Sequence, residues 1–338
     1  MKLSLLPQKG TLYKVNLHCH TNVSDGNQSP EDVKRVFKEK GYSAVCYTDH
    51  EVLIGHEDLC DEEFVALHGY EIAIKKDPAH HTGYFMPVYH FNFIAEKQDT
   101  RIMPRFYLNN PSMPGDARRW AEEQGQYDPA DVIDHTEYNT EWINNYLKAV
   151  TEGGFLVTYN HPQWSLQDKD DYIGLENLHA IEAINGGCRG LNDNTSLPFE
   201  QMLRAGKNVV PVAGDDNHSE GGCFYGWTMI KAEELTYDAL IAAYKKGDCF
   251  ASEGPDFLSV TLEEGTIKVE CSPVVRVDLL SEGRCHLGAR AANGASLCEV
   301  SFPYVPEKFG SFFRLELTDA QGKRAYSRAY RTADLIAE

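Results

Sequence analysis

The chain has 338 residues, of which 42% are hydrophobic and 25% are charged, and this ordinary globular mixture excludes a disordered, collagenous or low-complexity protein. It carries 51 acidic and 32 basic residues, a net charge of -19, which disfavours binding to long nucleic acids. No apolar run reaches the roughly 18 residues that a membrane-spanning helix needs, and no signal-peptide core begins the chain. We therefore predict a cytoplasmic protein that binds no membrane.

Seven β-rich runs occupy the first two thirds of the chain, and helical patterns separate several of them. Strands that alternate with helices predict right-handed βαβ units, and hence a parallel sheet or barrel. The predicted strands cover residues 13–17, 43–47, 64–70, 87–94, 155–159, 180–184 and 208–213. The predicted helices cover residues 29–40, 140–152, 199–205 and 236–246, and glycine follows each of them, directly or after one residue.

Residues 95–138 interrupt this alternation. They are rich in Pro, Asn, Asp and Gln, and such a long segment within a compact domain usually carries function or is an insertion. We expect an insertion that crosses the mouth of the barrel.

After Gly254-Pro255 the pattern changes to short alternating runs that are separated by turns. These runs predict a small antiparallel β-sandwich. We therefore expect two domains, residues 1–255 and 256–338. The nine cysteines form no C-x-x-C pair, so we expect free thiols rather than a zinc ribbon or disulfides.

Side chains that can bind metals follow or lie within strand after strand of the first domain. Residues two apart in an extended chain face the same side, so His18 and His20 can share one metal while Cys19 faces away. In α/β barrels the active site lies at the carboxyl ends of the strands. The other candidates are Asp49 and His50, Glu71, His90, His161, Glu182, and the run from Gly214 to His218. His81 is the alternative if His90 is not a ligand.

Four motifs resemble those of the PHP family, named for polymerase and histidinol phosphatase. The run from His18 to Gly26 matches H-x-H-[ST]-x-x-S-D-G in full. Thr48-Asp49-His50 resembles T-D-H, His161-Pro162 resembles a His-Pro that follows a strand, and Gly214 to His218 resembles G-[SD]-D-x-H. The resemblance covers residues 11 to 253, and the spacing of 71 residues between His90 and His161 is long for a compact member.

The resemblance implies a distorted (β/α)7 TIM-like barrel with a site for two to three divalent metal ions. Glu71 would bridge two of the ions, Asp49 would orient a ligand, and Asp215 and Glu182 would lie behind the ligands or face the substrate. The candidate catalytic residues are Asp49, Asp215, Arg189 and His218, with Arg189 as a phosphate-binding side chain. The implied metal ligands are His18, His20, Asp25, His50, Glu71, His90, His161, Asp216 and His218.

Mixed nitrogen and oxygen ligands without thiolate suit Zn, Mn or Fe. Such ions lower the pKa of a bridging water, and the resulting hydroxide attacks phosphorus. We therefore predict hydrolysis of a phosphoester in a small phosphorylated metabolite or nucleotide at a di- or trinuclear site. No nucleophile elbow or P-loop is present in the sequence.

Three other functions remain open. A barrel amidohydrolase also opens with H-x-H, but it would require a metal-bridging lysine where Glu71 stands. A non-catalytic binding protein would use the metals for stability and the β domain for binding. A DNA exonuclease is disfavoured by the net charge, although Arg101, Arg105, Arg118 and Arg119 give the insertion a local basic bias.

Overall fold

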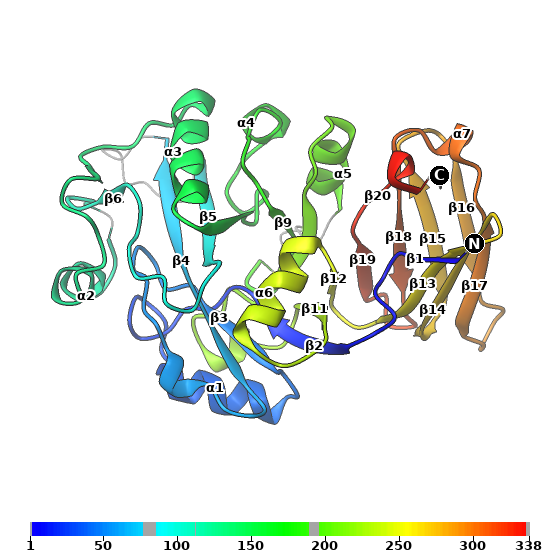
Figure 1. Ribbon diagram of the computed structural model, residues 1–338, viewed down its shortest axis with the longest axis horizontal. Helices are drawn as coiled ribbons and strands as arrows, with labels where there is room; N and C mark the ends of the chain where they lie inside the picture. The colour runs from blue at the N-terminus through cyan, green and yellow to red at the C-terminus, as the bar shows by residue number, and fades with distance from the viewer. Residues whose placement is uncertain (1, 77–85, 112, 189–195, 336–338) are drawn as a thin grey trace.

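The computed structural model describes residues 2–76, 86–111, 113–188 and 196–335. A larger body of strands and helices lies beside a smaller body made almost entirely of strands (Figure 1). Among the described residues, no helix is both long enough and apolar enough to cross a membrane.

All seven predicted strands of the larger body are present. They lie side by side in chain order within one large sheet, although the segments between them differ widely in length. They are β2 (Thr11–Asn16), β3 (Ala44–Tyr47), β4 (Val65–Lys75), β5 (Val88–Ala95), β8 (Phe155–Tyr159), β9 (Ala180–Asn185) and β10 (Val210–Gly214).

One strand of the seven runs against the others. β5 is antiparallel to both β4 and β8, whereas the remaining neighbours among the seven are parallel. The prediction that the third strand ends at Tyr70 is wrong, because pairing with β5 extends β4 to Lys75. Glu71 therefore lies within a strand, and His90 lies near the start of β5 at the same end of the sheet.

The two outer strands of the seven approach each other without forming a ladder between them in the described part of the chain. The Asp216 N–H donates to the His18 carbonyl at 3.0 Å, and the His20 N–H donates to the Asn217 carbonyl at 3.1 Å. Gly214 allows this approach, since a Cβ there would lie 2.5 Å from Cβ of His18. The fold is thus a mixed α/β fold in which the ends of β2 and β10 are in contact.

The four predicted helices also form, and each has a local cause. Ser29 caps α1 (Pro30–Glu39), Asn139 caps α3 (Thr140–Glu152) and Thr236 caps α6 (Tyr237–Lys246), each accepting a backbone N–H with its side chain. α5 (Leu197–Arg204) begins with a proline in its first turn. The buried faces of these helices pack against the sheet and so fix the strands that carry the site.

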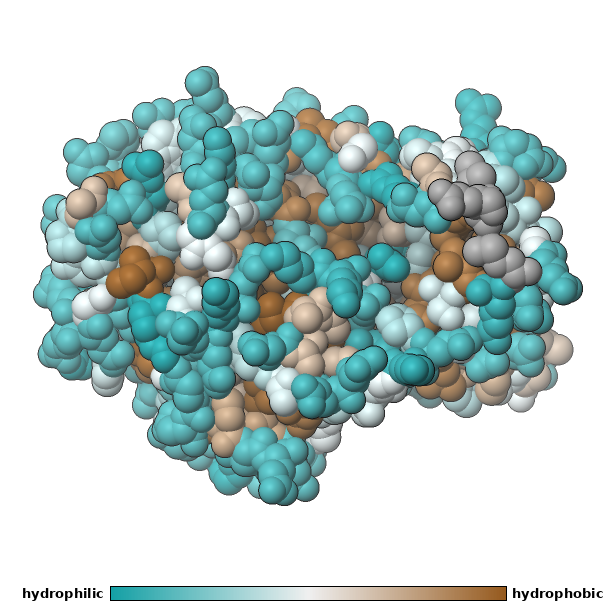
Figure 2. Space-filling view, viewed as in Figure 1, coloured by the Kyte–Doolittle hydropathy of each residue, from teal (hydrophilic) through white to brown (hydrophobic). Residues whose placement is uncertain are grey.

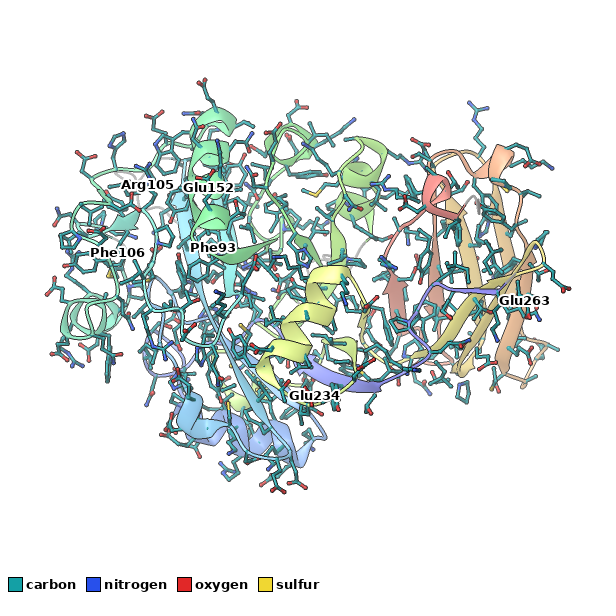
Figure 3. All side chains as sticks on the ribbon, viewed as in Figure 1. Phe93, Arg105, Phe106, Glu152, Glu234 and Glu263 are labelled. Atoms are coloured by element: carbon teal, nitrogen blue, oxygen red, sulfur yellow. The ribbon has the colours of Figure 1, made fainter. Side chains whose placement is uncertain are left out.

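The insertion contains elements that the sequence pattern did not predict. They are a pair of parallel two-residue strands, β6 (Phe106–Tyr107) and β7 (Val132–Ile133), and the helix α2 (Ala117–Glu123). Asp116 stands at the N-cap of α2, but its side chain makes no capping hydrogen bond. Figure 3 labels Arg105 and Phe106 in this insertion, and the Phe106 side chain is buried against the main core.

The smaller body consists of two layers of antiparallel strands. Apolar side chains of both layers, such as Val260 and Ile267 from one and Val277 and Leu315 from the other, share one buried cluster. One layer contains β1 (Lys2–Ser4), β13 (Phe257–Glu263), β14 (Thr266–Val274) and β17 (Leu297–Pro303). The other contains β15 (Arg276–Ser281), β16 (His286–Arg290), β18 (Phe312–Thr318), β19 (Arg324–Ser327) and β20 (Tyr330–Arg331).

The two bodies are continuous through the large sheet. β11 (Trp227–Ala232) pairs with β2 and with β12 (Cys249–Ser252), and β12 pairs in turn with β19 of the smaller body. The start of the chain joins the smaller body as well, because β1 pairs with β13 near Glu263, which Figure 3 labels. The remaining short helices are α4 (Lys169–Tyr172), α7 (Pro306–Phe309), η1 (Glu57–Leu59), η3 (Glu220–Gly222) and η4 (Thr332–Leu335).

Candidate metal centre

The nine predicted ligands lie together at one end of the seven strands. Together with Glu182 they form four overlapping groups, and within each group the possible ligand atoms all lie within 4.8 Å of one another. The groups are His18, His20, Glu71 and Asp216; His20, Asp25, His50 and His218; Glu71, His90 and His161; and His18, His161 and Glu182.

Glu71 stands at the centre of this cluster. Its Oε1 lies 3.1 Å from Nδ1 of His90 and 3.3 Å from Nε2 of His161. Its Oε2 lies 3.2 Å from Nδ1 of His50 and 3.3 Å from Nε2 of His20. The side chain is almost fully buried, and its two oxygens lie among the imidazoles of these four histidines.

The innermost group is closed to solvent on nearly every side. The Nε2 atoms of His18 and His20 lie 3.1 Å apart, and Oδ1 of Asp216 lies 3.3 Å from the first and 3.1 Å from the second. Alternation along the extended chain directs both imidazoles to this point, as their spacing predicts. Two nitrogens and two carboxylates therefore surround one position.

A more open group lies beside it. Nε2 of His218 lies 3.4 Å from Oδ1 of Asp25, and Nε2 of His50 lies 3.8 Å from the other oxygen of that carboxylate. The side chains of Asp25 and His218 are 40% and 42% exposed, so this group faces the solvent. Of the two roles predicted for His218, ligand and catalytic residue, its contact with Asp25 favours ligand.

Backbone strain accompanies the site. His161 and Asp216 have positive φ values of 21° and 51°, a region that residues other than glycine seldom occupy. Such strain persists only where the surrounding structure imposes it, and it concentrates at functional sites. At both positions the strained residue directs a possible ligand toward Glu71.

Buried polar side chains hold the ligands in place. Oε1 of Glu182 lies 2.8 Å from Nδ1 of His18, while Oε2 accepts the His161 N–H at 3.1 Å. This carboxylate thus fixes the ring of His18 in the way that carboxylates commonly fix metal-binding histidines. Asn160 donates to Oε1 of Glu71 at 2.8 Å, a role that the residue pattern did not reveal beyond its place before His161-Pro162.

Asp49 and Asp215, predicted as catalytic residues, are occupied by hydrogen bonds to loops. Asp49 accepts the backbone N–H and the hydroxyl of both Thr21 and Ser24. Asp215 accepts three backbone N–H groups, from Phe224, Tyr225 and Gly226. These partners favour a positioning role for both carboxylates. Arg189, and His81 as the alternative to His90, lie outside the described residues.

Charge accumulates within the cluster. Burial opposes charging of His20, but the carboxylates of Asp216 and Glu71 outweigh it and raise the pKa of His20 to about 10. Burial and the neighbouring His20 together lower the pKa of His50 to about 3. The pKa of Glu71 is held well below its usual range, because the surrounding histidines outweigh its burial. The carboxylates of Glu71 and Asp216 therefore require positive charge between them.

The donor set fits divalent metal ions. Nδ1 of His20 is buried without a hydrogen-bond partner in the described structure. The imidazole of His20 is shared by the innermost group and the solvent-facing group. Buried polar atoms are normally satisfied, so an orphan among ligands indicates an absent partner. Cys19 is not a competing thiolate, because burial first, and then nearby carboxylates, raise the pKa of its thiol well above the usual value. Nitrogen and oxygen ligands of this kind suit Zn, Mn or Fe.

Residues 16–152 match the PHP domain family. This segment contains six of the nine predicted ligands, from His18 to His90. None of the curated protein sequences compared with the chain matches it significantly.

Several solved structures resemble the chain at low sequence identity. A two-domain protein from Bacteroides vulgatus, described as containing a predicted PHP-like metal-dependent phosphoesterase, is 14% identical over 97% of this chain and 98% of its own, with a TM-score of 0.45. A putative metal-dependent phosphoesterase from Bifidobacterium adolescentis is 16% identical over 64% and 90%, with a TM-score of 0.39. An amidohydrolase from Chromobacterium violaceum, with bound sulfate and no metal, is 15% identical over 61% and 88%, with a TM-score of 0.40.

Proposed function

We propose that this chain, whose residues 16–152 match the PHP domain family, is a metal-dependent phosphoesterase that hydrolyses a small phosphorylated compound at a site with two to three divalent ions. The observation that carries the proposal is the convergence of nine side chains with nitrogen or oxygen donors, of which Glu71 is the central one. We further propose that the seven strands form a distorted barrel closed by the contacts between the ends of β2 and β10, with residues 256–338 as a separate β-sandwich domain.

Each part of the cluster has its own task in this proposal. His18, His20, Glu71 and Asp216 would hold the innermost ion. Asp25, His50 and His218 would hold the ion that faces solvent, and His90 and His161 would complete a third position with Glu71. Bound divalent ions would supply a nucleophilic water of lowered pKa and neutralise the phosphoryl oxygens.

The protein's own residues prepare the site for this chemistry. Glu182 fixes the ring of His18, and Asp49 fixes the loop that carries Asp25. Burial of Glu71 and His18 excludes water from the inner side of the cluster, which strengthens every electrostatic interaction there. The half-exposed side chains of Asp25 and His218 leave the outer side open for substrate.

Glu71 also favours phosphoester hydrolysis over the amidohydrolase alternative. That alternative would require a lysine that bridges two metals from a strand in the middle of the barrel. In this chain the carboxylate of Glu71 on β4 would take the bridging position, because its two oxygens lie within 3.3 Å of nitrogens from four histidines.

The proposal is tested by hydrolysis of p-nitrophenyl phosphate and bis(p-nitrophenyl) phosphate after loading the protein with Mn, Zn or Fe(II). We expect activity with at least one metal, and a loss of about 100-fold or more in His20→Ala, because two ligand groups lose a shared imidazole. His135→Ala is the matched control, since His135 is exposed and lies outside the ligand groups. Full metal loading with no hydrolysis of either ester would contradict the proposal, and hydrolysis of cyclic amides instead would favour the amidohydrolase.

A further inference from the structure

Trp164 is an exposed aromatic side chain beside the metal centre. It is 46% exposed, and it is the aromatic member of the six large hydrophobic residues that are exposed in the described structure. It also belongs to none of the buried apolar clusters or to the partly buried side chains packed against them. Its ring therefore adds little to the core of the fold.

The indole contacts two of the proposed ligands. The ring centres of Trp164 and His161 are 5.1 Å apart at an interplanar angle of 76°, and those of Trp164 and His90 are 5.4 Å apart at 47°. These two histidines, with Glu71, form the third ligand group. A phosphoester bound there would carry its organic group within reach of the indole.

The loop that carries Trp164 is fixed on both sides. The Ser165 N–H donates to the His161 carbonyl at 3.1 Å, and the Gln167 N–H donates to the Pro162 carbonyl at 2.9 Å. The Ser165 hydroxyl lies 3.1 Å from Nδ1 of His161, and the Ser165 carbonyl accepts the Val88 N–H at 3.2 Å. The backbone that carries the indole is thus held in position before any substrate arrives, which lowers the entropy cost of stacking on it.

We propose that Trp164 is a specificity-determining residue whose indole stacks on a planar aromatic ring in the ester group of the substrate. This inference rests on the proposed phosphoesterase function and names the class of substrate that the site prefers. An exposed tryptophan provides a large π-face with little conformational freedom to lose on binding. Stacking on a planar ring adds to the apolar contact that a saturated ring of similar size would also make.

The test compares benzyl phosphate with cyclohexylmethyl phosphate. Both esters release a primary alcohol and carry a six-membered carbon ring, so they differ chiefly in the planarity of that ring. The variants are Trp164→Leu, which removes the π-face, and Trp164→Phe, which restores one. Leu258→Ala is the control, since Leu258 is an equally exposed apolar residue on β13 of the smaller body.

We expect Trp164→Leu to lower kcat/KM for benzyl phosphate by about tenfold, with a change below about twofold for cyclohexylmethyl phosphate. Trp164→Phe should recover most of the loss, and Leu258→Ala should leave kcat/KM unchanged for both esters. The metal content of all variants should equal that of the unsubstituted protein. An equal loss for both esters, or a loss of bound metal in Trp164→Leu, would overturn the inference, because Trp164 would then be an apolar wall or a support for the ligands.

Equilibrium binding separates this inference from the proposed function. The affinity of the metal-loaded protein for each ester is measured by calorimetry, whether or not hydrolysis occurs. A tenfold loss of benzyl phosphate affinity in Trp164→Leu without any hydrolysis would support the stacking site and overturn the phosphoesterase function. Hydrolysis of both esters with unchanged affinity and rate in Trp164→Leu would support the phosphoesterase function and overturn the stacking site.

Discussion

Asp49 links the motif from His18 to Gly26 to the second strand of the site. Its carboxylate accepts four hydrogen bonds from the turn that contains Thr21 and Ser24, two of them from backbone N–H groups. Gly26 closes this turn, since a Cβ there would lie 2.7 Å from the His20 carbonyl oxygen. The position of Asp25 in the solvent-facing group is therefore set by a buried carboxylate that is not itself a ligand in the four groups.

Asp49→Asn should loosen this turn, because an amide offers one acceptor oxygen and turns its NH₂ group toward donors. We expect a loss of about 1–3 kcal/mol in the free energy of unfolding and a 10- to 100-fold weaker affinity for the most loosely bound metal. Chemical denaturation and a metal titration monitored by calorimetry measure the two effects.

Asp32→Asn is the control for this substitution, since Asp32 is an exposed carboxylate that bonds to Arg35 within α1. Its removal should leave both the midpoint of denaturation and the metal affinity close to those of the unsubstituted protein. Unchanged metal affinity in Asp49→Asn would show that the turn holds Asp25 without this carboxylate.

At the scale of the elements, the reversed strand β5 determines which residues reach the metal centre. The sequence predicts the shared face of His18 and His20, because a spacing of two in an extended chain has one outcome. It does not reveal that β5 is antiparallel to β4, which places His90 opposite Ala73 and near Glu71. That arrangement depends on long-range pairing, for which local residue patterns carry little information.

A side chain of β11 also links this strand to β10. The Thr228 hydroxyl accepts the Ala213 N–H at 2.9 Å and donates to the Ala213 carbonyl at 2.9 Å, so one side chain satisfies both backbone groups. Thr228 is fully buried, and water cannot replace this bridge without opening the sheet.

Thr228→Val keeps the shape of the side chain and removes its hydroxyl. We expect a loss of about 1–3 kcal/mol in the free energy of unfolding, because two buried backbone groups lose their partner. Thr261→Val on β13 is the matched control, as Thr261 is buried and its hydroxyl makes no hydrogen bond found in the described part of the chain. Equal stability of the two variants in urea denaturation would argue against the bridge as a stabilising contact.

At the scale of the whole molecule, the two bodies share more than one connection. Besides the sheet that runs from β11 through β12 to β19, a buried ion pair joins Arg314 of β18 to Glu200 of α5 at 2.8 Å. Arg314 also donates to Ser196 at 3.2 Å. The face of the molecule that Figure 2 shows is largely hydrophilic, with smaller apolar patches, in keeping with the net charge of -19.

Glu200→Gln should destabilise the whole protein, because Arg314 is 2% exposed and would lose a charged partner while Glu316 remains at 3.3 Å. We expect a loss of about 1.5–3 kcal/mol in the free energy of unfolding. Arg119→Met, which breaks exposed ion pairs with Asp116 and Glu123 at α2, should change the unfolding midpoint much less than Glu200→Gln does. Separate unfolding transitions for the two bodies in the unsubstituted protein would contradict this coupling.

Local signals account for the parts of the molecule that the sequence predicts. Alternation and capping residues predicted the seven strands and four helices of the larger body, and the resemblance of its motifs to those of the PHP family implied the nine side chains that lie together. Features that the sequence did not predict, such as β1 and the position of Trp164, depend on contacts between distant segments. β1 is only three residues long and is defined by its partner β13, and the position of Trp164 depends on how its loop packs against β5.

The central claim is a single metal centre built around Glu71. Elemental mass spectrometry of the protein after loading with Mn, Zn or Fe(II) and removal of free metal tests it most directly. We expect two to three ions per chain with at least one of these metals, and at least one ion fewer in Glu71→Gln, because this carboxylate belongs to two of the four ligand groups and lies 3.2 Å from His50 of another. Less than one ion per chain under every loading condition, or an unchanged number in Glu71→Gln, would contradict the account.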